Sequence, residues 1–344
     1  MHSNIYFLDQ LRPVWGPMKI FVYDYREHDE KQFFEKYTKE MGMEMHYTLE
    51  HLSPENVDLA KGCEFVSIFT TPCTAPMLDR FKEIGVKMIC TRCIGFDHID
   101  INHAKEIGMV VTNITYDTEG VAEFTVMDIL MAVRRVKELY FRTMENDFRL
   151  NGMLARQLKD MSVGIVGAGK IGISVLRNLS GFGCKLYYCN RSRNENADKY
   201  AERIEMDELL ERCDIVSLHL ELNDATYHIM GKENIAKMKD GAILINTARG
   251  ALVDTEELIS ALESGHLTSA ALDVVEGEFG LYYNDCSDMD LENHFIGRLR
   301  KMPNVIFTHH MAYYYTESVR DMVYNCLYGM KMYSEGKEIP FRLA

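Results

Sequence analysis

Six short apolar runs in the second half of the chain constrain its fold more than any other feature. They read SVGIVG, KLYYC, DIVSLHL, AILIN, AALDVV and NVIFT. Their successive starts lie roughly 25 to 35 residues apart, which is the length of a strand, helix and strand unit. The runs are apolar throughout rather than alternating, as strands buried on both faces are. We therefore predict a doubly wound parallel sheet covered by helices.

A second sheet of the same kind is predicted in the first half. Between Met18 and about Asp117, the runs KIFVYDY, FVSIFTT, KMICTR and MVVTN alternate with polar, helix-favouring stretches. Such alternation is typical of an α/β domain. Residues 1–17 precede the first strand pattern, and we expect them to contribute little to the fold.

A long segment from Glu119 to about Asn146 carries apolar residues at helical spacing. We predict one long helix here, capped by Asp117 or Thr118. Further along, Asp254 stands three residues before Glu257, which predicts a capped helix start.

Composition narrows the classes of partner and compartment. The chain has 344 residues, 47% of them hydrophobic, and a net charge of −14, which repels nucleic acid and anionic membranes. No apolar run is long enough to span a membrane. The nine cysteines are odd in number and lie largely in apolar runs, which favours reduced thiols and a cytoplasmic location. Cys90 and Cys93 form a CxxC without a second ligand pair, so we expect no metal.

The glycines of SVGIVGAGKIG predict a dinucleotide site. Gly167, Gly169 and Gly172 stand as GxGxxG directly after a predicted strand, and Lys170 and Ile171 open the following helix. In this pattern the first glycine permits a tight turn, the second lets the backbone approach a pyrophosphate, and the third permits close packing of helix on strand. We therefore predict that these five residues bind a dinucleotide cofactor.

The end of the next strand bears on cofactor choice. An NAD site usually places an acid about 20 residues past the glycines, to hold the ribose hydroxyls. This chain has Asn190, Arg191 and Arg193 instead. Arginine can pair with a 2′-phosphate that an acid would repel, so the sequence favours NADP(H) over NAD(H). The alternative is that these arginines only form a solvated loop.

Side chains that can take part in catalysis or ligand binding follow three later strands. Arg249 follows AILIN, Asp273 and Glu278 follow AAL, and the adjacent His309 and His310 follow NVIFT. The carboxyl ends of strands in a doubly wound sheet face the ligand crevice. We expect these side chains to converge there.

At this point the chain resembles the D-2-hydroxyacid dehydrogenase family, in particular its D-lactate dehydrogenase and VanH-type branch. The motifs are GAGKIG, NTARGALVDT, ALDVVEGE and MPNVIFTHHMAYYYTESVRDMV, with TRCIGFDHID and YDTEGVAEFT in the first half. The resemblance implies a Rossmann cofactor domain, residues 118–315, inserted in a flavodoxin-like substrate domain, residues 18–117 and 316–344. It also implies a site in the cleft between the domains.

The family motif implies roles for the catalytic residues. Aligned without gaps, it places His310 on the acid/base histidine and His309 on a proline. Glu278 matches the carboxylate that pairs with the histidine, while Glu276 is a second choice. Arg249 matches the residue that binds the substrate carboxylate and polarises its carbonyl. A histidine suits proton transfer because its ordinary pKa is near neutral.

Further residues match binding positions of the family. Asp273 matches an acceptor for the nicotinamide carboxamide, and Thr247 and Ala248 lie in a cofactor-binding motif. On the substrate side, the matching positions are Ile94, Gly95, Tyr116 and Tyr313.

The resemblance implies reduction of a small 2-oxo acid, most simply pyruvate to D-lactate, by a homodimer. Two alternatives stay open at this point. One is a larger branched or aromatic 2-oxo acid as the substrate. The other is a non-catalytic, dinucleotide-sensing scaffold similar to the corepressor members of the family.

Overall fold

The computed structural model describes residues 17–344, and the chain divides into two compact units. The first comprises residues up to Tyr116 together with Val319–Ala344, and the second comprises Asp117–Ser318. We expect residues 1–17 to contribute little to the fold. Apart from Pro17, these residues lie outside the described part of the chain. The domain limits expected from the sequence, 18–117 with 316–344 and 118–315, stay predictions of functional domains.

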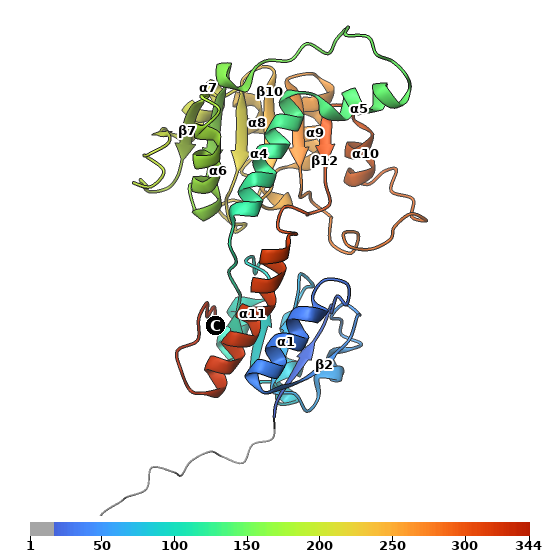
Figure 1. Cartoon of the computed structure of the whole chain (residues 1–344), viewed down its shortest axis with the longest axis vertical. Helices are drawn as coiled ribbons and strands as arrows, with labels where there is room; N and C mark the ends of the chain where they lie inside the picture. Colours follow the sequence, from blue (N-terminus) through green and yellow to red (C-terminus); the bar gives the residue numbers. More distant parts are fainter. Residues whose placement is uncertain (1–16) are drawn as a thin grey trace, which may run out of the picture. The chain divides into compact units, whose positions relative to one another are not determined.

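The first unit is built on a five-stranded parallel sheet (Figure 1). Its order is β2-β1-β3-β4-β5, which is the order of flavodoxin-like sheets. The strands are β1 (Met18–Val22), β2 (Met43–Tyr47), β3 (Phe65–Ile68), β4 (Met88–Thr91) and β5 (Val110–Thr112). The helices are α1 (Lys31–Met41), α2 (Ala75–Glu83), α3 (Ile101–Ile107), α11 (Thr316–Ser334) and the short 3-10 helix η1 (Val57–Ala60).

The end of the chain completes this unit. Helix α11 lies against β3, where Tyr333 packs edge-on against Phe65 at 5.7 Å between ring centroids. About two turns earlier on the same helix, Cys326 Sγ lies 3.2 Å from Ser67 Oγ. Beyond α11 the chain pairs with β5, since Leu343 N donates to Val111 O at 2.8 Å.

The second unit is built on a seven-stranded sheet of order β12-β11-β10-β9-β6-β7-β8, with every pairing parallel. The strands are β6 (Ser162–Val166), β7 (Lys185–Cys189), β8 (Glu202–Arg203), β9 (Ile215–Leu218), β10 (Ala242–Asn246), β11 (Leu267–Leu272) and β12 (Val305–Phe307). The helices are α4 (Glu119–Val133), α5 (Val136–Met144), α6 (Lys170–Ser180), α7 (Met206–Arg212), α8 (Lys232–Lys237), α9 (Thr255–Glu263), α10 (Phe295–Lys301), and the 3-10 helices η2 (Leu158–Asp160) and η3 (Gly250–Leu252). This order is that of a Rossmann sheet, so the predicted fold class is confirmed.

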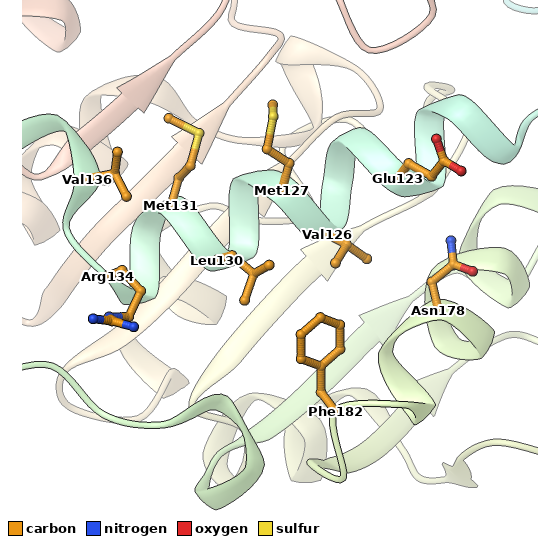
Figure 2. Close-up of a pocket in the computed structure, with 9 residues that line it drawn as sticks. All are labelled: Glu123, Val126, Met127, Leu130, Met131, Arg134, Val136, Asn178 and Phe182. Atoms are coloured by element: carbon orange, nitrogen blue, oxygen red, sulfur yellow. The ribbon is translucent and has the colours of Figure 1, made fainter.

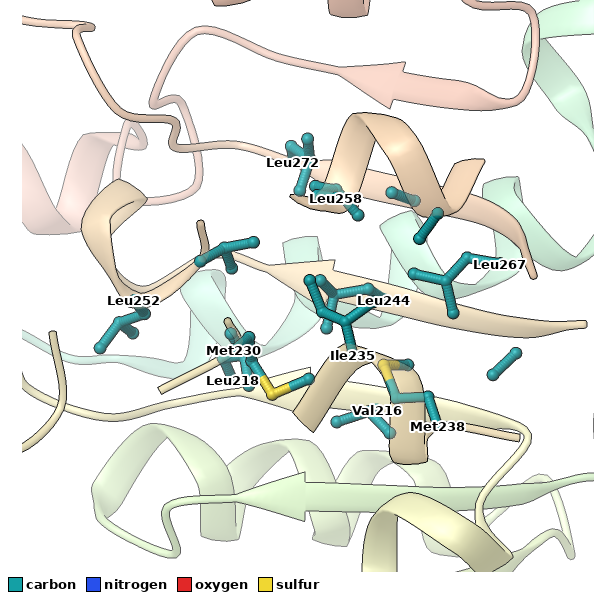
Figure 3. Packing of buried hydrophobic residues seen from close by; sticks show 14 of the residues in the cluster. Val216, Leu218, Met230, Ile235, Met238, Leu244, Leu252, Leu258, Leu267 and Leu272 are labelled. Carbon is teal, nitrogen blue, oxygen red and sulfur yellow. The ribbon is translucent and has the colours of Figure 1, made fainter. Parts of the chain in front are cut away.

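Both faces of the seven-stranded sheet are buried. On β10, Ile243 and Ile245 join a core that also contains residues of α4 and α6. The alternate residue Leu244 points into a second core with residues of α8 and α9 (Figure 3). Because successive strand side chains point to opposite faces, a strand buried on both faces must be apolar throughout. This explains the continuous apolar runs.

The single helix expected from Glu119 to about Asn146 is wrong. Helix α4 ends at Val133, and α5 begins at Val136. The break is at Arg135, which adopts a left-handed conformation with φ of 53° and so cannot continue a right-handed helix. Of the two caps expected for the start of α4, Thr118 occupies the N-cap position but its side chain forms no capping hydrogen bond, whereas the Asp117 carboxylate accepts a hydrogen bond from Glu119 N at 3.1 Å.

The capped start expected near Asp254 is confirmed. The Asp254 carboxylate accepts a hydrogen bond from Glu257 N at 3.2 Å, and α9 begins at Thr255. The reciprocal bond of a full capping box is not formed, because Asp254 N donates to Met230 O instead.

Two further features concern the whole described chain. Between residues 17 and 344, every helix is too short or too polar to cross a membrane. All nine cysteines are free thiols; Cys90 is fully buried within β4, whereas Cys93 is partly exposed.

Candidate active site

The glycine loop between β6 and α6 has the geometry of a dinucleotide loop. Gly167 has φ of +99°, and a Cβ added to it would lie 2.4 Å from His219 O. A Cβ added to Gly172 would lie 2.1 Å from Gly167 O, so this glycine lets α6 approach the strand. A Cβ on Gly169 would meet nothing within 4 Å. The chain itself therefore does not require glycine at 169, whereas a pyrophosphate approaching the backbone there does.

The segment after β7 is tied to this loop. Asn190 Oδ1 accepts a hydrogen bond from Ala168 N at 3.3 Å, and Asn190 O accepts one from Arg203 Nη2 at 3.1 Å. Arg191 is exposed, while Arg193 pairs with Asp198 at 2.6 Å between Nε and Oδ2. Arg203 could not be predicted from the sequence, because a cation on a separate two-residue strand gives no signal in the glycine motif.

His310 and Glu278 form a hydrogen-bonded pair. His310 Nδ1 lies 2.8 Å from Glu278 Oε1, and both side chains are partly exposed. The other carboxylate oxygen of Glu278 accepts a hydrogen bond from Val275 N at 2.9 Å, which fixes its orientation. A carboxylate on Nδ1 favours the tautomer or ionised form with hydrogen on that nitrogen. Nε2 is then the nitrogen positioned to serve a reacting group.

Neither His309 nor Glu276, the two competing candidates, belongs to this hydrogen-bonded pair. His309 is exposed to solvent. Glu276 points elsewhere: its carboxylate pairs with His228 Nε2 at 2.7 Å and accepts hydrogen bonds from Thr255 N and Oγ1 at 3.0 and 2.8 Å. Glu276 therefore holds the start of α9, and Glu278 is the carboxylate beside His310.

Asp273 anchors the loop that carries His310. This side chain is fully buried at the end of β11. It accepts hydrogen bonds from Thr308 Oγ1 at 2.6 Å, Met311 N at 2.8 Å and Ala312 N at 2.9 Å. His310 itself adopts φ of 59° and donates its backbone N–H to Asp273 O at 2.7 Å. These bonds hold His310 in a conformation that few non-glycine residues adopt. The contact with the nicotinamide carboxamide stays a prediction for Asp273.

The loop that carries Arg249 follows β10. Asn246 ties the loop down by donating to Arg249 O at 2.8 Å and accepting from Ala248 N at 3.1 Å. A Cβ added to Gly250 would lie 2.2 Å from the carbonyl carbon of Val275. Gly250 thus brings the Arg249 loop into direct contact with the segment that leads to Glu278, a packing constraint that sequence analysis missed.

Aromatic rings surround His310. Tyr313 is buried and packs edge-on against the imidazole, with 5.9 Å between ring centroids. Tyr283, which sequence analysis did not single out, lies 6.4 Å from both of these rings, and its hydroxyl donates to His310 O at 3.1 Å. These tyrosines form part of the apolar surroundings of the proposed acid/base group.

Two more ionisable groups lie close to these loops. Burial lowers the pKa of His219, beside Gly167, to about 4, so it is neutral at pH 7. Asp128 of α4 is fully buried, and within the described chain neither of its carboxylate oxygens has a hydrogen-bond partner. Burial, assisted by the negative charge of Asp273, raises the pKa of Asp128 to about 8.

Three of the residues expected to bind the substrate belong to the first unit. Ile94 and Gly95 lie in the loop after β4, and Tyr116 follows β5. Asn113 Nδ2 donates to Ile94 O at 2.6 Å and so fixes the loop. In the described part of the chain the backbone N–H groups of Ile94 and Gly95 donate to no acceptor. Their role toward a substrate stays a prediction.

A Rossmann sheet with a glycine loop at one strand end and a carboxylate–histidine pair at others defines the class of a dinucleotide-dependent dehydrogenase. Comparison with known proteins gives the family: residues 126–312 match D-isomer specific 2-hydroxyacid dehydrogenase, NAD binding domain. This chain belongs to the D-isomer specific 2-hydroxyacid dehydrogenase family. It is thus an oxidoreductase that binds NAD(H) and interconverts 2-oxo acids and D-2-hydroxy acids.

Two relatives and one solved structure illustrate the similarity. The chain is 43% identical over 306 residues to a D-specific alpha-keto acid dehydrogenase of Enterococcus faecium, covering 88% of this chain and 94% of that protein. It is 38% identical over 309 residues to an aromatic 2-oxoacid reductase of Clostridium sporogenes, covering 89% and 93%. The crystal structure of a D-lactate dehydrogenase from Aquifex aeolicus, complexed with NAD and lactic acid, matches with a TM-score of 0.83 and 30% identity, covering 92% of this chain and 96% of that one.

Proposed function

We propose that this chain reduces pyruvate to D-lactate, with His310 as acid/base, Glu278 as its partner and Arg249 binding the substrate carboxylate. The observation that carries the proposal is the 2.8 Å contact between His310 Nδ1 and Glu278 Oε1, which orients Nε2 for proton transfer. A bound reduced nicotinamide supplies the hydride for the carbonyl carbon. His310 Nε2 supplies the proton for the carbonyl oxygen, and the product is the D-2-hydroxy acid.

The charges of the site support these roles. A 2-oxo acid carries a carboxylate, and the planar fork of Arg249 can bind it with two hydrogen bonds. Glu278 balances the positive charge of a protonated His310 before transfer. After transfer the imidazole is neutral, and its Nδ1 hydrogen remains bonded to the carboxylate. The same pair run backwards accepts the proton during oxidation of the hydroxy acid.

Substrate choice is tested by initial rates of cofactor oxidation with pyruvate, 2-oxoisocaproate and phenylpyruvate. The relatives bear names that include both a lactate and an aromatic 2-oxo acid enzyme. Pyruvate turnover with the highest kcat/KM supports the proposal. Higher kcat/KM with phenylpyruvate would assign an aromatic substrate instead. Cofactor binding without turnover of any of the three would contradict the proposed roles of His310, Glu278 and Arg249.

For the cofactor, we propose a preference for NADP(H). The support is the absence of an acid at Asn190, Arg191 and Arg193, together with the exposed guanidinium of Arg191. Arg193 is already paired with Asp198, so Arg191 is the more accessible cation for a 2′-phosphate. Arg191→Ala should raise the KM for NADPH and leave that for NADH nearly unchanged. Equal losses with both cofactors would show that Arg191 does not contact the phosphate.

We also propose that the protein is a homodimer formed through the second unit. An apolar groove with a volume of about 530 Å³ lies on α4, and Figure 2 shows Phe182 pointing toward Val126 and Leu130 at its base. Nearby in sequence, Phe148 and Leu154 are 72% and 96% exposed, which is unusual for large apolar side chains. Light scattering after gel filtration tests the proposal. A dimer mass that falls to the monomer mass in Phe148→Ser/Leu154→Ser supports it, whereas a monomeric parent protein contradicts it.

A cytoplasmic location stays a proposal as well. It rests on the odd number of cysteines and on their free thiols.

A further inference from the structure

The sheet of the second unit has the glycine loop at one end, and a polar cavity lies at its opposite end. It is formed at the amino-terminal ends of β6, β7 and β9 and has a volume of about 540 Å³, which is within the range of small-ligand sites. Strand β6 has five residues, so this end is about 16 Å from the glycine loop. The cavity is therefore separate from the dinucleotide site.

The lining of this cavity is strongly basic, although the whole chain has a net charge of −14. Two carboxylates, Asp160 and Asp214, face five cations in the lining. The cations are Arg156, Lys159, Lys185, Arg212 and Lys239.

Asp214 is a buried carboxylate of the lining and pairs with two of the five cations. Its Oδ1 binds Arg156 Nη1 at 2.9 Å and Lys239 Nζ at 2.7 Å. Its Oδ2 accepts hydrogen bonds from Ser162 N and Oγ at 2.9 and 3.0 Å. The Asp214 side chain is only 9% exposed, so this cluster is a fixed part of the fold. Two positive charges around one carboxylate leave this cluster with a net positive charge.

The guanidinium of Arg212 is held in a defined orientation at the side of the cavity. It lies 4.5 Å above the centroid of the Tyr187 ring, and its Nη2 donates to the Tyr187 hydroxyl at 2.8 Å. Its Nη1 pairs with Glu208, which is not part of the lining. A planar fork stacked on an aromatic ring loses little freedom when it binds an oxyanion.

Two lysines add charge that the protein does not neutralise. Lys159 and Lys185 are both exposed, and neither forms an ion pair within residues 17–344. They lie on neighbouring segments, because Lys185 N donates to Met161 O at 3.1 Å, two residues from Lys159. Their two ammonium groups therefore add to the positive field of one small surface. Like charges brought together repel one another, and a bound anion would relieve that repulsion.

We propose that this cavity binds a small anion that carries phosphate groups. Arginine forks and lysine ammonium groups are the side chains that bind phosphate oxygens through charge-assisted hydrogen bonds. The positive lining attracts such an anion locally, while the acidic remainder of the surface disfavours extended polyanions. The proposal does not depend on which 2-oxo acid the enzyme reduces.

The test is isothermal titration with inorganic pyrophosphate, using protein saturated with NADH so that the dinucleotide loop is occupied. We expect binding of one pyrophosphate per chain, and at least a tenfold loss of affinity in Lys159→Gln/Lys185→Gln. Neither lysine side chain forms a hydrogen bond or ion pair in the described chain, so this variant should fold normally. The matched control is Lys61→Gln/Lys232→Gln, which removes the same charge from two exposed lysines elsewhere. Its affinity should equal that of the parent protein.

Three outcomes would overturn the proposal. Equal weakening in both variants would show only a general effect of net charge. Binding that NADH abolishes would belong to the glycine loop, and the absence of binding at millimolar pyrophosphate would leave the cavity without this function. A fourth titration, with a single-stranded DNA oligonucleotide, covers a larger anion. DNA binding lost in Lys159→Gln/Lys185→Gln, without pyrophosphate binding, would refute a small-anion site.

Discussion

Asp128→Asn should change how the stability of the second unit depends on pH. The carboxyl group of Asp128 is fully buried next to Asp273 without a hydrogen-bond partner in the described chain, and its pKa is raised to about 8. In the unfolded chain the same group ionises near its ordinary value of 3.8. The pKa of Asp128 is thus about four units higher in the folded protein than in the unfolded chain, so the folded protein keeps this proton to a higher pH. Ionisation of the unfolded chain therefore lowers the free energy of unfolding progressively from about pH 4 to about pH 8.

The magnitude follows from the shift. Each unit of pKa difference corresponds to about 1.4 kcal/mol, so Asp128 should cost about 1.4 kcal/mol of stability per pH unit within this window. The full window corresponds to about 6 kcal/mol, which is an upper limit because the protein around a buried group relaxes when that group becomes charged. Asparagine has nearly the same shape and does not ionise, so Asp128→Asn removes this slope. The gap between variant and parent should widen by about 4 kcal/mol from pH 5 to pH 8.

Urea unfolding at pH 5, 6, 7 and 8, followed by circular dichroism, measures this gap. The matched control is Asp224→Asn, which removes the same charge from an exposed loop. Its stability curve should stay parallel to that of the parent protein. If the Asp128→Asn curve is also parallel to the parent curve, then Asp128 ionises normally in the folded state and the reasoning from its burial is wrong.

Three further predictions address the site and the fold. His310→Ala should lower kcat by about 10²- to 10⁴-fold with cofactor affinity retained, whereas His309→Ala should stay close to the parent rate; exchanged results would assign the acid/base role to the other histidine. Gly172→Ala should lower the melting temperature markedly, because the new Cβ lies 2.1 Å from a carbonyl oxygen of the same loop, whereas Gly169→Ala should melt normally and bind cofactor more weakly. Equal melting of these two glycine variants would contradict the packing argument. Asp254→Ala should cost about 1 kcal/mol of unfolding free energy through loss of the cap on α9, and an unchanged value in urea unfolding would show that the cap contributes nothing.

The sequence was sufficient for features that depend on local pattern. Continuous apolar runs predicted the parallel sheet of the second unit, because strands buried on two faces are apolar throughout. The alternation of apolar runs with helix-favouring stretches predicted the sheet of the first unit. The cap at Asp254 and the glycine turn at Gly167 also depend on residues within one short segment. The family motif or the structure was needed to establish two other features. These are the order of the strands and the pairing of His310 with Glu278 rather than with Glu276. Two glutamates two residues apart look equivalent until their directions are known.

Other features had no local signal. The break between α4 and α5 depends on a left-handed arginine at 135, and arginine is ordinarily a good helix former. Tyr283 reaches His310, and Arg203 reaches Asn190, only because distant segments are brought together in the fold. Asp128 is the clearest case. An acid in a largely apolar helix is usually assigned to the solvent-exposed face, yet Asp128 is buried.

The discontinuity of the first unit has a consequence for synthesis of the protein on the ribosome. The strands β1 to β5 are made before the second unit, but α11, whose Tyr333 and Cys326 cover Phe65 and Ser67 of β3, is made only after most of it. About 200 residues separate the two parts, which at 5 to 20 residues per second takes about 10 to 40 s. During that time the second unit, which is continuous, can fold to completion. The nascent first unit meanwhile presents an apolar sheet face, and a chaperone that covers it would protect the chain from aggregation until α11 arrives.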